Sequence, residues 1–96
     1  MPLFAFTGYD GPQGSELRKR HRPAHLAGLE GLAAADRIRH AGPLLDDEGR
    51  PLGSLILFEA ETLEEARTIA ARDPYVTECI FERYDVHETR VVFPQP

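Results

Sequence analysis

Among the histidines and carboxylates of this 96-residue chain, His25 and Asp73 stand out as candidates for proton transfer because of their positions. His25 belongs to a stripe of residues spaced by four, four, four and three positions. The stripe comprises Leu17, His21, His25, Leu29 and Leu32. Residues at this spacing share one face of a helix, so we expect the imidazole to point toward the core. Asp73 follows Ala66 by seven positions and Ala70 by three, and it continues the inner face of a second expected helix.

A histidine and a carboxylate that meet inside a fold can act as a general base or acid. The carboxylate bonded to one ring nitrogen fixes the tautomer and makes the other nitrogen a better base. Each residue also has a structural interpretation: His25 as a core histidine bonded to a backbone carbonyl, and Asp73 as a turn before Pro74. Arg22, one helical turn before His25, can hold a substrate carboxylate in its guanidinium fork, or can form only a surface ion pair.

Other kinds of site have weaker support in the sequence. The four histidines lack zinc-type spacing and the chain has one cysteine, so we expect no structural zinc site. A metal site built from His25, His40 and Asp73 is conceivable in space. The GxxGxxG pattern at residues 8–14 has no GK[ST] sequence, which favours turn glycines over a nucleotide-binding loop. We therefore expect neither a metal nor a cofactor.

The composition argues against nucleic acid and membrane partners. The net charge is −5, and the one basic run, at residues 18–22, is either a solvated helix face or an anion-steering patch. The longest aliphatic-aromatic run, Leu55–Phe58, is too short to cross a bilayer, and the start does not resemble a signal peptide. The single Cys79 excludes an intrachain disulfide, and beside Ile80 we expect it to be a small buried residue. These observations predict a cytoplasmic protein.

The first half of the chain contains a strand, a helix and a second strand. Residues 3–9 predict a strand that is apolar, and so covered, on both faces. Ser15 is the expected cap of a helix over residues 16–35, which Pro23 should kink or divide, with the main piece starting near Arg22. Residues 37–45 predict a strand with a bend or bulge at Gly42-Pro43.

The second half contains a hairpin strand, a helix and a last strand. A polar turn at residues 46–51 leads to a strand at 54–60, which pairs with the preceding strand as an antiparallel hairpin. Thr62 and Glu65 match a capping box for a helix that ends at Asp73-Pro74. Residues 74–78 can form a short extra turn, residues 80–91 a fourth strand, and residues 93–96 a tail.

The resulting order, β-α-β-β-α-β, predicts an α+β fold of the ferredoxin-like type in a single domain over residues 1–96. The sheet should have four antiparallel strands, with both helices on one face because crossovers are right-handed. The other face is too apolar to remain wet, and a second copy of the chain is its simplest cover. We therefore expect a homodimer.

The chain resembles the YciI-like (YCII-related) family of small bacterial proteins over nearly its whole length. The shared marks are Tyr9-Asp10, Arg22-Pro23-Ala24-His25-Leu26, Ala41-Gly42-Pro43, Gly53-Ser54 and Asp73-Pro74-Tyr75. The resemblance implies a dimeric α+β barrel in which His25 and Asp73 form the catalytic pair. It also implies a cleft in which Arg22, Gly42, Ser54 and Tyr75 bind the substrate.

Relatives in that family include a dehydrochlorinase that acts on a chlorinated hydroxyhydroquinone. The present chain departs from the family pattern in a shorter loop at residues 46–51 and in Thr89-Arg90-Val91 where the family has a Lys-rich end. Because loops and tails shape pockets, the substrate itself does not transfer.

Three functions remain open at this point. The first is a cofactor-free lyase or isomerase in which His25 moves a proton on a small anionic or aromatic substrate. The alternative is a non-catalytic module whose cleft binds a small molecule. The third is a purely structural dimer, in which His25 is a core residue.

Overall fold

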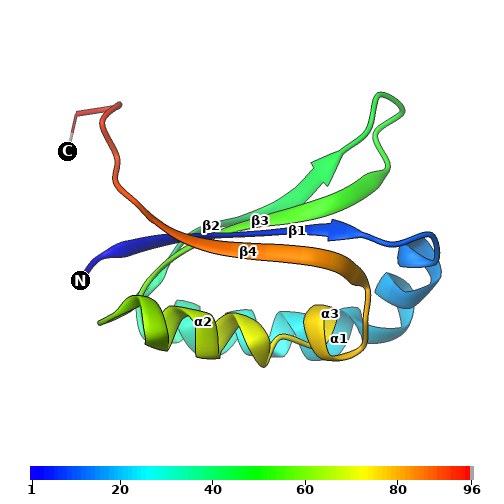
Figure 1. Ribbon diagram of the computed structural model, residues 1–96, viewed down its shortest axis with the longest axis horizontal. Helices are drawn as coiled ribbons and strands as arrows, with labels where there is room; N and C mark the ends of the chain where they lie inside the picture. Colours follow the sequence, from blue (N-terminus) through cyan, green and yellow to red (C-terminus); the bar gives the residue numbers. More distant parts are fainter. Residues whose placement is uncertain (96) are drawn as a thin grey trace.

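The computed structural model describes residues 1–95, which form a four-stranded antiparallel sheet with a layer of helices on one face (Figure 1). The strand order across the sheet is β2-β3-β1-β4. In chain order the elements are β1 (Leu3–Asp10), α1 (Gly14–Ala34), β2 (Ile38–Leu45), β3 (Pro51–Glu59), α2 (Leu63–Ala71), α3 (Pro74–Thr77) and β4 (Phe81–Thr89). The predicted ferredoxin-like fold is confirmed, and the short turn expected after Asp73 is α3.

The core lies between the sheet and the helices, and it is built from alternate residues of the two central strands. Phe4, Phe6, Ile56 and Phe58 are each at most 3% exposed. The register places Phe4 opposite Phe58 and Phe6 opposite Ile56, so large side chains fill one continuous layer. Full burial of each contributes about 1.5–3 kcal/mol to stability. Helix α1 packs against this layer through Leu17 and Leu29.

The opposite face of the sheet has no cover within residues 1–95. All three helices lie on one side, while the tip of the β2–β3 hairpin and the segment after β4 project on the other side (Figure 1). Leu55 and Leu57 of β3 face that side and are half-buried by their neighbours. The second cover predicted for β1 is therefore not supplied by residues 1–95.

Helix α1 differs from the prediction at its start, and at Pro23 it agrees with one of the two predicted outcomes. It begins at Gly14 after Gln13, and no side chain caps it, so the predicted Ser15 cap is wrong. The reason is a backbone turn in which the Gly14 N–H donates to Gly11 O at 3.0 Å and starts the helix earlier. Pro23 lies inside the helix without dividing it, although the first turns lie at an angle to the rest (Figure 1).

The missing N–H of Pro23 removes one helical hydrogen bond. Side chains on both sides of it, Leu17 and Leu29, pack against the same core and hold the two parts of α1 in one helix. Of the two predicted outcomes, a kink and a division, the division is not observed, because tertiary packing outweighs the local cost.

Two further local predictions are wrong. Gly42 and Pro43 pair in regular register with Leu55 and Ser54, and the irregularities of β2 lie at its two ends instead. A proline is tolerated there because β2 is an edge strand and need not donate to a second neighbour. Cys79 is exposed, not buried, with φ at +60°, and the turn it makes delivers Ile80 to the core in its place.

Candidate active site

A cavity of about 500 Å³ lies between α1 and the strands β2 and β3, on the helix side of the sheet. Its polar wall comprises Ser15, Arg18, Lys19, Arg22, His25, Ser54 and Tyr75. Its apolar wall comprises Leu26, Leu29, Ala41, Pro43, Pro51 and Ile56, with Gly42 beside them. Among residues 1–95 no Asp or Glu lines it, although the chain carries a net charge of −5. The cavity therefore suits a small anionic or polarised ligand with an apolar body.

His25 is held against Asp73 at one end of this cavity. Its Nδ1 lies 2.8 Å from Asp73 Oδ1 and 2.9 Å from Oδ2. Because an ionised carboxylate can only accept, Nδ1 carries the proton in this contact, and in the neutral imidazole Nε2 then carries the lone pair. Within residues 1–95 Nε2 has no protein partner, and no buried side-chain nitrogen lacks one, so Nε2 is reachable by solvent. The pair thus presents a basic nitrogen where a ligand can meet it.

The backbone of α3 fixes the carboxylate of Asp73. Asp73 is the N-cap residue of this helix, in extended conformation before Pro74, and its Oδ1 accepts the Tyr75 N–H at 2.8 Å. The helix-terminus turn and the partner of His25 are therefore the same side chain. The structure thus shows both the turn and the predicted contact of Asp73 with His25.

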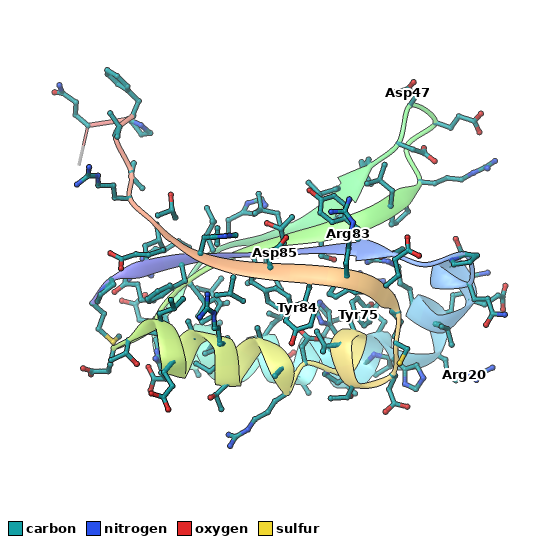
Figure 2. The ribbon with its side chains drawn as sticks, in the orientation of Figure 1. Arg20, Asp47, Tyr75, Arg83, Tyr84 and Asp85 are labelled. Carbon is teal, nitrogen blue, oxygen red and sulfur yellow. The ribbon has the colours of Figure 1, made fainter. Side chains whose placement is uncertain are left out.

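Tyr75 stacks on the His25 ring, with centroids 3.9 Å apart and planes 4° from parallel. Its own ring meets Phe81 edge-on at 5.7 Å, and the residue is 2% exposed. Figure 2 shows it in the layer between β4 and the helices. Burial raises the pKa of the Tyr75 hydroxyl above its usual value, while the nearby Arg18 and Arg22 charges oppose the rise. The imidazole is thus restrained at its edge by Asp73 and on its face by Tyr75.

Arg18 is a site residue that the sequence analysis placed only within a basic run. Its Nε and Nη2 donate to the two carboxylate oxygens of Asp10, at 2.6 and 2.9 Å, and Nη2 also donates to Ser54 Oγ at 3.1 Å. The side chains of Arg18 and Asp10 are almost fully buried. The signal that could have found it is spacing, because positions 18, 22, 25 and 29 share one helical face.

The remaining predicted site residues all border the same cavity. Arg22 lines it and is exposed, Gly42 lies on β2, and Ser54 is 5% exposed on β3. The conceivable metal site with His40 is not formed: across residues 1–95 no three metal-ligating side chains lie close enough to hold an ion. No helix in that range is long and apolar enough to span a membrane.

Comparisons with known proteins point to one family. The family model of the YCII-related domain matches residues 2–90. The protein YciI of Escherichia coli is 35% identical over 97 residues, which cover 95% of this chain and 99% of that protein. An uncharacterized protein of Haemophilus influenzae is 36% identical over 96 residues, covering 94% and 98% of the two chains.

One solved structure is similar in both sequence and fold. It is 5-chloro-2-hydroxyhydroquinone dehydrochlorinase (TftG) from Burkholderia phenoliruptrix, in complex with 2,5-dihydroxybenzoquinone. The match has a TM-score of 0.81 at 30% identity and covers 92% of this chain and 93% of that chain.

Proposed function

Because this chain belongs to the YCII-related family, we propose that it is a cofactor-free lyase or isomerase acting on a small anionic or aromatic substrate. His25 is the proton carrier and Asp73 is its positioning partner. The observation that carries this proposal is the double contact of His25 Nδ1 with Asp73, at 2.8 and 2.9 Å, beside an accessible Nε2 on a cavity wall.

The chemistry follows from the fixed tautomer. Nε2 takes a proton from the substrate, and the ionised Asp73 stabilises the imidazolium that forms. In an isomerase the same proton returns to a different atom of the substrate. In a lyase the electron pair of the broken C–H bond forms a double bond and expels a leaving group. Such general base catalysis contributes roughly 10²–10⁴ to the rate.

The cavity supports the proposed substrate class. Arg22 and Lys19 supply positive charge, and Leu26, Leu29 and Ile56 supply an apolar wall. A cavity of about 500 Å³ is within the usual range for small-molecule sites. TftG was solved with 2,5-dihydroxybenzoquinone, a planar molecule rich in oxygen, and we propose a ligand of that general kind here. Gly42, Ser54 and Tyr75 would form the walls that bind it.

The test is a proton-transfer assay on hydroxyquinones and hydroxyquinols, followed by ultraviolet absorbance and by hydrogen–deuterium exchange in NMR spectra. His25→Asn should lower the rate by about 10²-fold or more, since it removes the base. Asp73→Asn should also lower it, because an amide cannot stabilise the imidazolium. The matched control is His21→Asn, one turn earlier on α1 and outside the cavity.

A His25→Asn protein that turns over a substrate at the rate of the unaltered chain would disprove the proposed role. Compounds that bind and stabilise the protein without any proton exchange would favour the non-catalytic binding module instead.

We further propose that two copies pair through their uncovered sheet faces. The half-buried Leu55 and Leu57 line that face, and the exposed apolar residues Leu45, Val92 and Phe93 lie on the hairpin and the segment after β4, which project on the same side (Figure 1). Light scattering should give twice the 10.7 kDa mass of one chain. A monomeric mass at micromolar concentration would rule this pairing out.

A further inference from the structure

Arg18 offers unused hydrogen-bond donors next to the proposed base. A guanidinium has five N–H groups, and here Asp10 and Ser54 take one from Nε and two from Nη2. The two N–H groups of Nη1 have no protein acceptor within residues 1–95. Because no buried side-chain nitrogen in that range lacks a partner, Nη1 is open to solvent, and Arg18 borders the cavity.

The position of Arg18 is fixed before any ligand arrives. The Asp10 carboxylate accepts two hydrogen bonds from the guanidinium, and the side chains of Arg18 and Asp10 are only 13% and 7% exposed. The guanidinium carbon lies 5.0 Å from the centre of the Tyr75 ring, on which His25 also stacks at 3.9 Å. Contact with one shared ring places the Arg18 donors and the His25 base within the span of one small molecule.

The charge of this arrangement indicates what it binds. Asp10 neutralises Arg18, so the pair as a whole does not require an anion. A neutral carbonyl oxygen fits the two Nη1 donors, and it binds more tightly as it gains negative charge during a reaction. Arg22, in contrast, forms no ion pair within residues 1–95, and it suits a group that is charged from the start.

We propose that Arg18 binds the carbonyl oxygen of the substrate, and that the substrate is an enolisable carbonyl compound such as the keto tautomer of a hydroxyquinol, which has an sp3 C–H group next to the C=O. This inference rests on the proposed function, since His25 supplies the base. In the step, Nε2 removes the proton from the carbon next to the C=O group. The C–H electron pair forms a C=C bond, and the C=O π pair moves to the oxygen, which Nη1 stabilises as the enolate. No oxidant or reductant is needed.

The test measures the affinity for 2,5-dihydroxybenzoquinone by isothermal titration calorimetry. Arg18→Gln should weaken binding about 10- to 100-fold, because it removes hydrogen bonds between charged and polarised groups. Arg18→Lys should weaken it similarly, since an ammonium cannot hold Asp10 and present two parallel donors together. The matched control is Arg20→Gln, which removes the same charge from α1 at an exposed position outside the cavity and should bind as the unaltered chain does (Figure 2).

Because Arg18→Gln leaves Asp10 buried without its partner, it can fail to fold. The double variant Asp10→Asn with Arg18→Gln removes both charges and keeps the test valid. If this folded double variant, or Arg18→Lys, binds the quinone as tightly as the unaltered chain, the Arg18 site is refuted. Absence of binding to the unaltered chain at about 1 mM, a weak-ligand limit, refutes the substrate class.

His25→Asn separates this inference from the proposed function. It should retain affinity for the quinone and lose proton exchange. If exchange persists in His25→Asn while the Arg18 variants lose affinity, the base assignment fails and the oxygen site stands.

Discussion

Gly14 is the residue whose substitution most directly tests how the Asp10–Arg18 pair is held. A Cβ atom built on Gly14 would lie 2.5 Å from Asp10 Oδ2, 2.7 Å from Asp10 Cβ and 2.9 Å from Asp10 Cγ. All three distances are shorter than real Cβ contacts allow. In Gly14→Ala either the start of α1 or the Asp10 carboxylate must therefore move.

Two opposing effects decide the outcome. Replacing glycine by alanine stabilises a helix by at most about 1 kcal/mol, a value that applies to helix interiors, and Gly14 is the first residue of α1. Displacing Asp10 breaks a buried ion pair with contacts of 2.6 and 2.9 Å, and breaking such a pair costs about 3–5 kcal/mol. The loss exceeds the gain, so we expect a net destabilisation of about 2–4 kcal/mol, or a Tm lower by roughly 10–30 °C for a domain of this size.

The assay is thermal and urea unfolding followed by circular dichroism, at equal protein concentrations. Gly28→Ala is the matched control, because it lies in the same helix and its added Cβ meets nothing within 4 Å. We expect this control to gain about 0.5–1 kcal/mol. A Gly14→Ala protein as stable as Gly28→Ala would refute the packing argument and, with it, the claim that Arg18 is rigidly positioned.

Three other outcomes are expected. Gly8→Ala should lower the free energy of unfolding by about 1–3 kcal/mol in urea titrations, because its Cβ would lie 2.5 Å from the Phe81 ring; an unchanged midpoint would contradict this. Thr62→Ala should lower the free energy of unfolding by about 1 kcal/mol in the same assay, since the Thr62 hydroxyl accepts the Glu65 N–H at the start of α2. An unchanged free energy of unfolding would show that this cap does not stabilise the helix. Because burial raises the pKa of Tyr75 above the ordinary 10.0, the folded state favours the neutral phenol, so stability should fall as the pH rises above 10.0. Tyr75→Phe should remove that part of the alkaline loss, and an identical pH profile in the variant would disagree.

The helical period explains why the sequence alone placed His25 next to Asp73. Every residue on the stripe through His25 must face the sheet if α1 packs at all, and the inner face of α2 leads along the chain to residue 73. The hydrogen bond between the two side chains agrees with that expectation. Their role in catalysis remains the proposal made above.

The features that sequence reasoning missed depend on contacts between elements. Arg18 and Asp10 are eight positions apart, one on a helix and one at a strand end, and no periodicity links them. Pro23 has a strong local tendency to end a helix, yet packing on both sides of it keeps α1 continuous. Cys79 was misplaced because the left-handed turn at this residue, with φ at +60°, shifts the buried position to Ile80.

The carboxylate of Asp73 links the folding of α3 to the position of the His25 ring. One of its oxygens, Oδ1, both starts α3 and contacts the imidazole of His25. If the segment after α2 frays, the His25 imidazole loses the contact with Asp73 that orients it. Under the proposed function, partly unfolded chains would therefore be inactive, and proton-transfer activity would report that this part of the fold is intact.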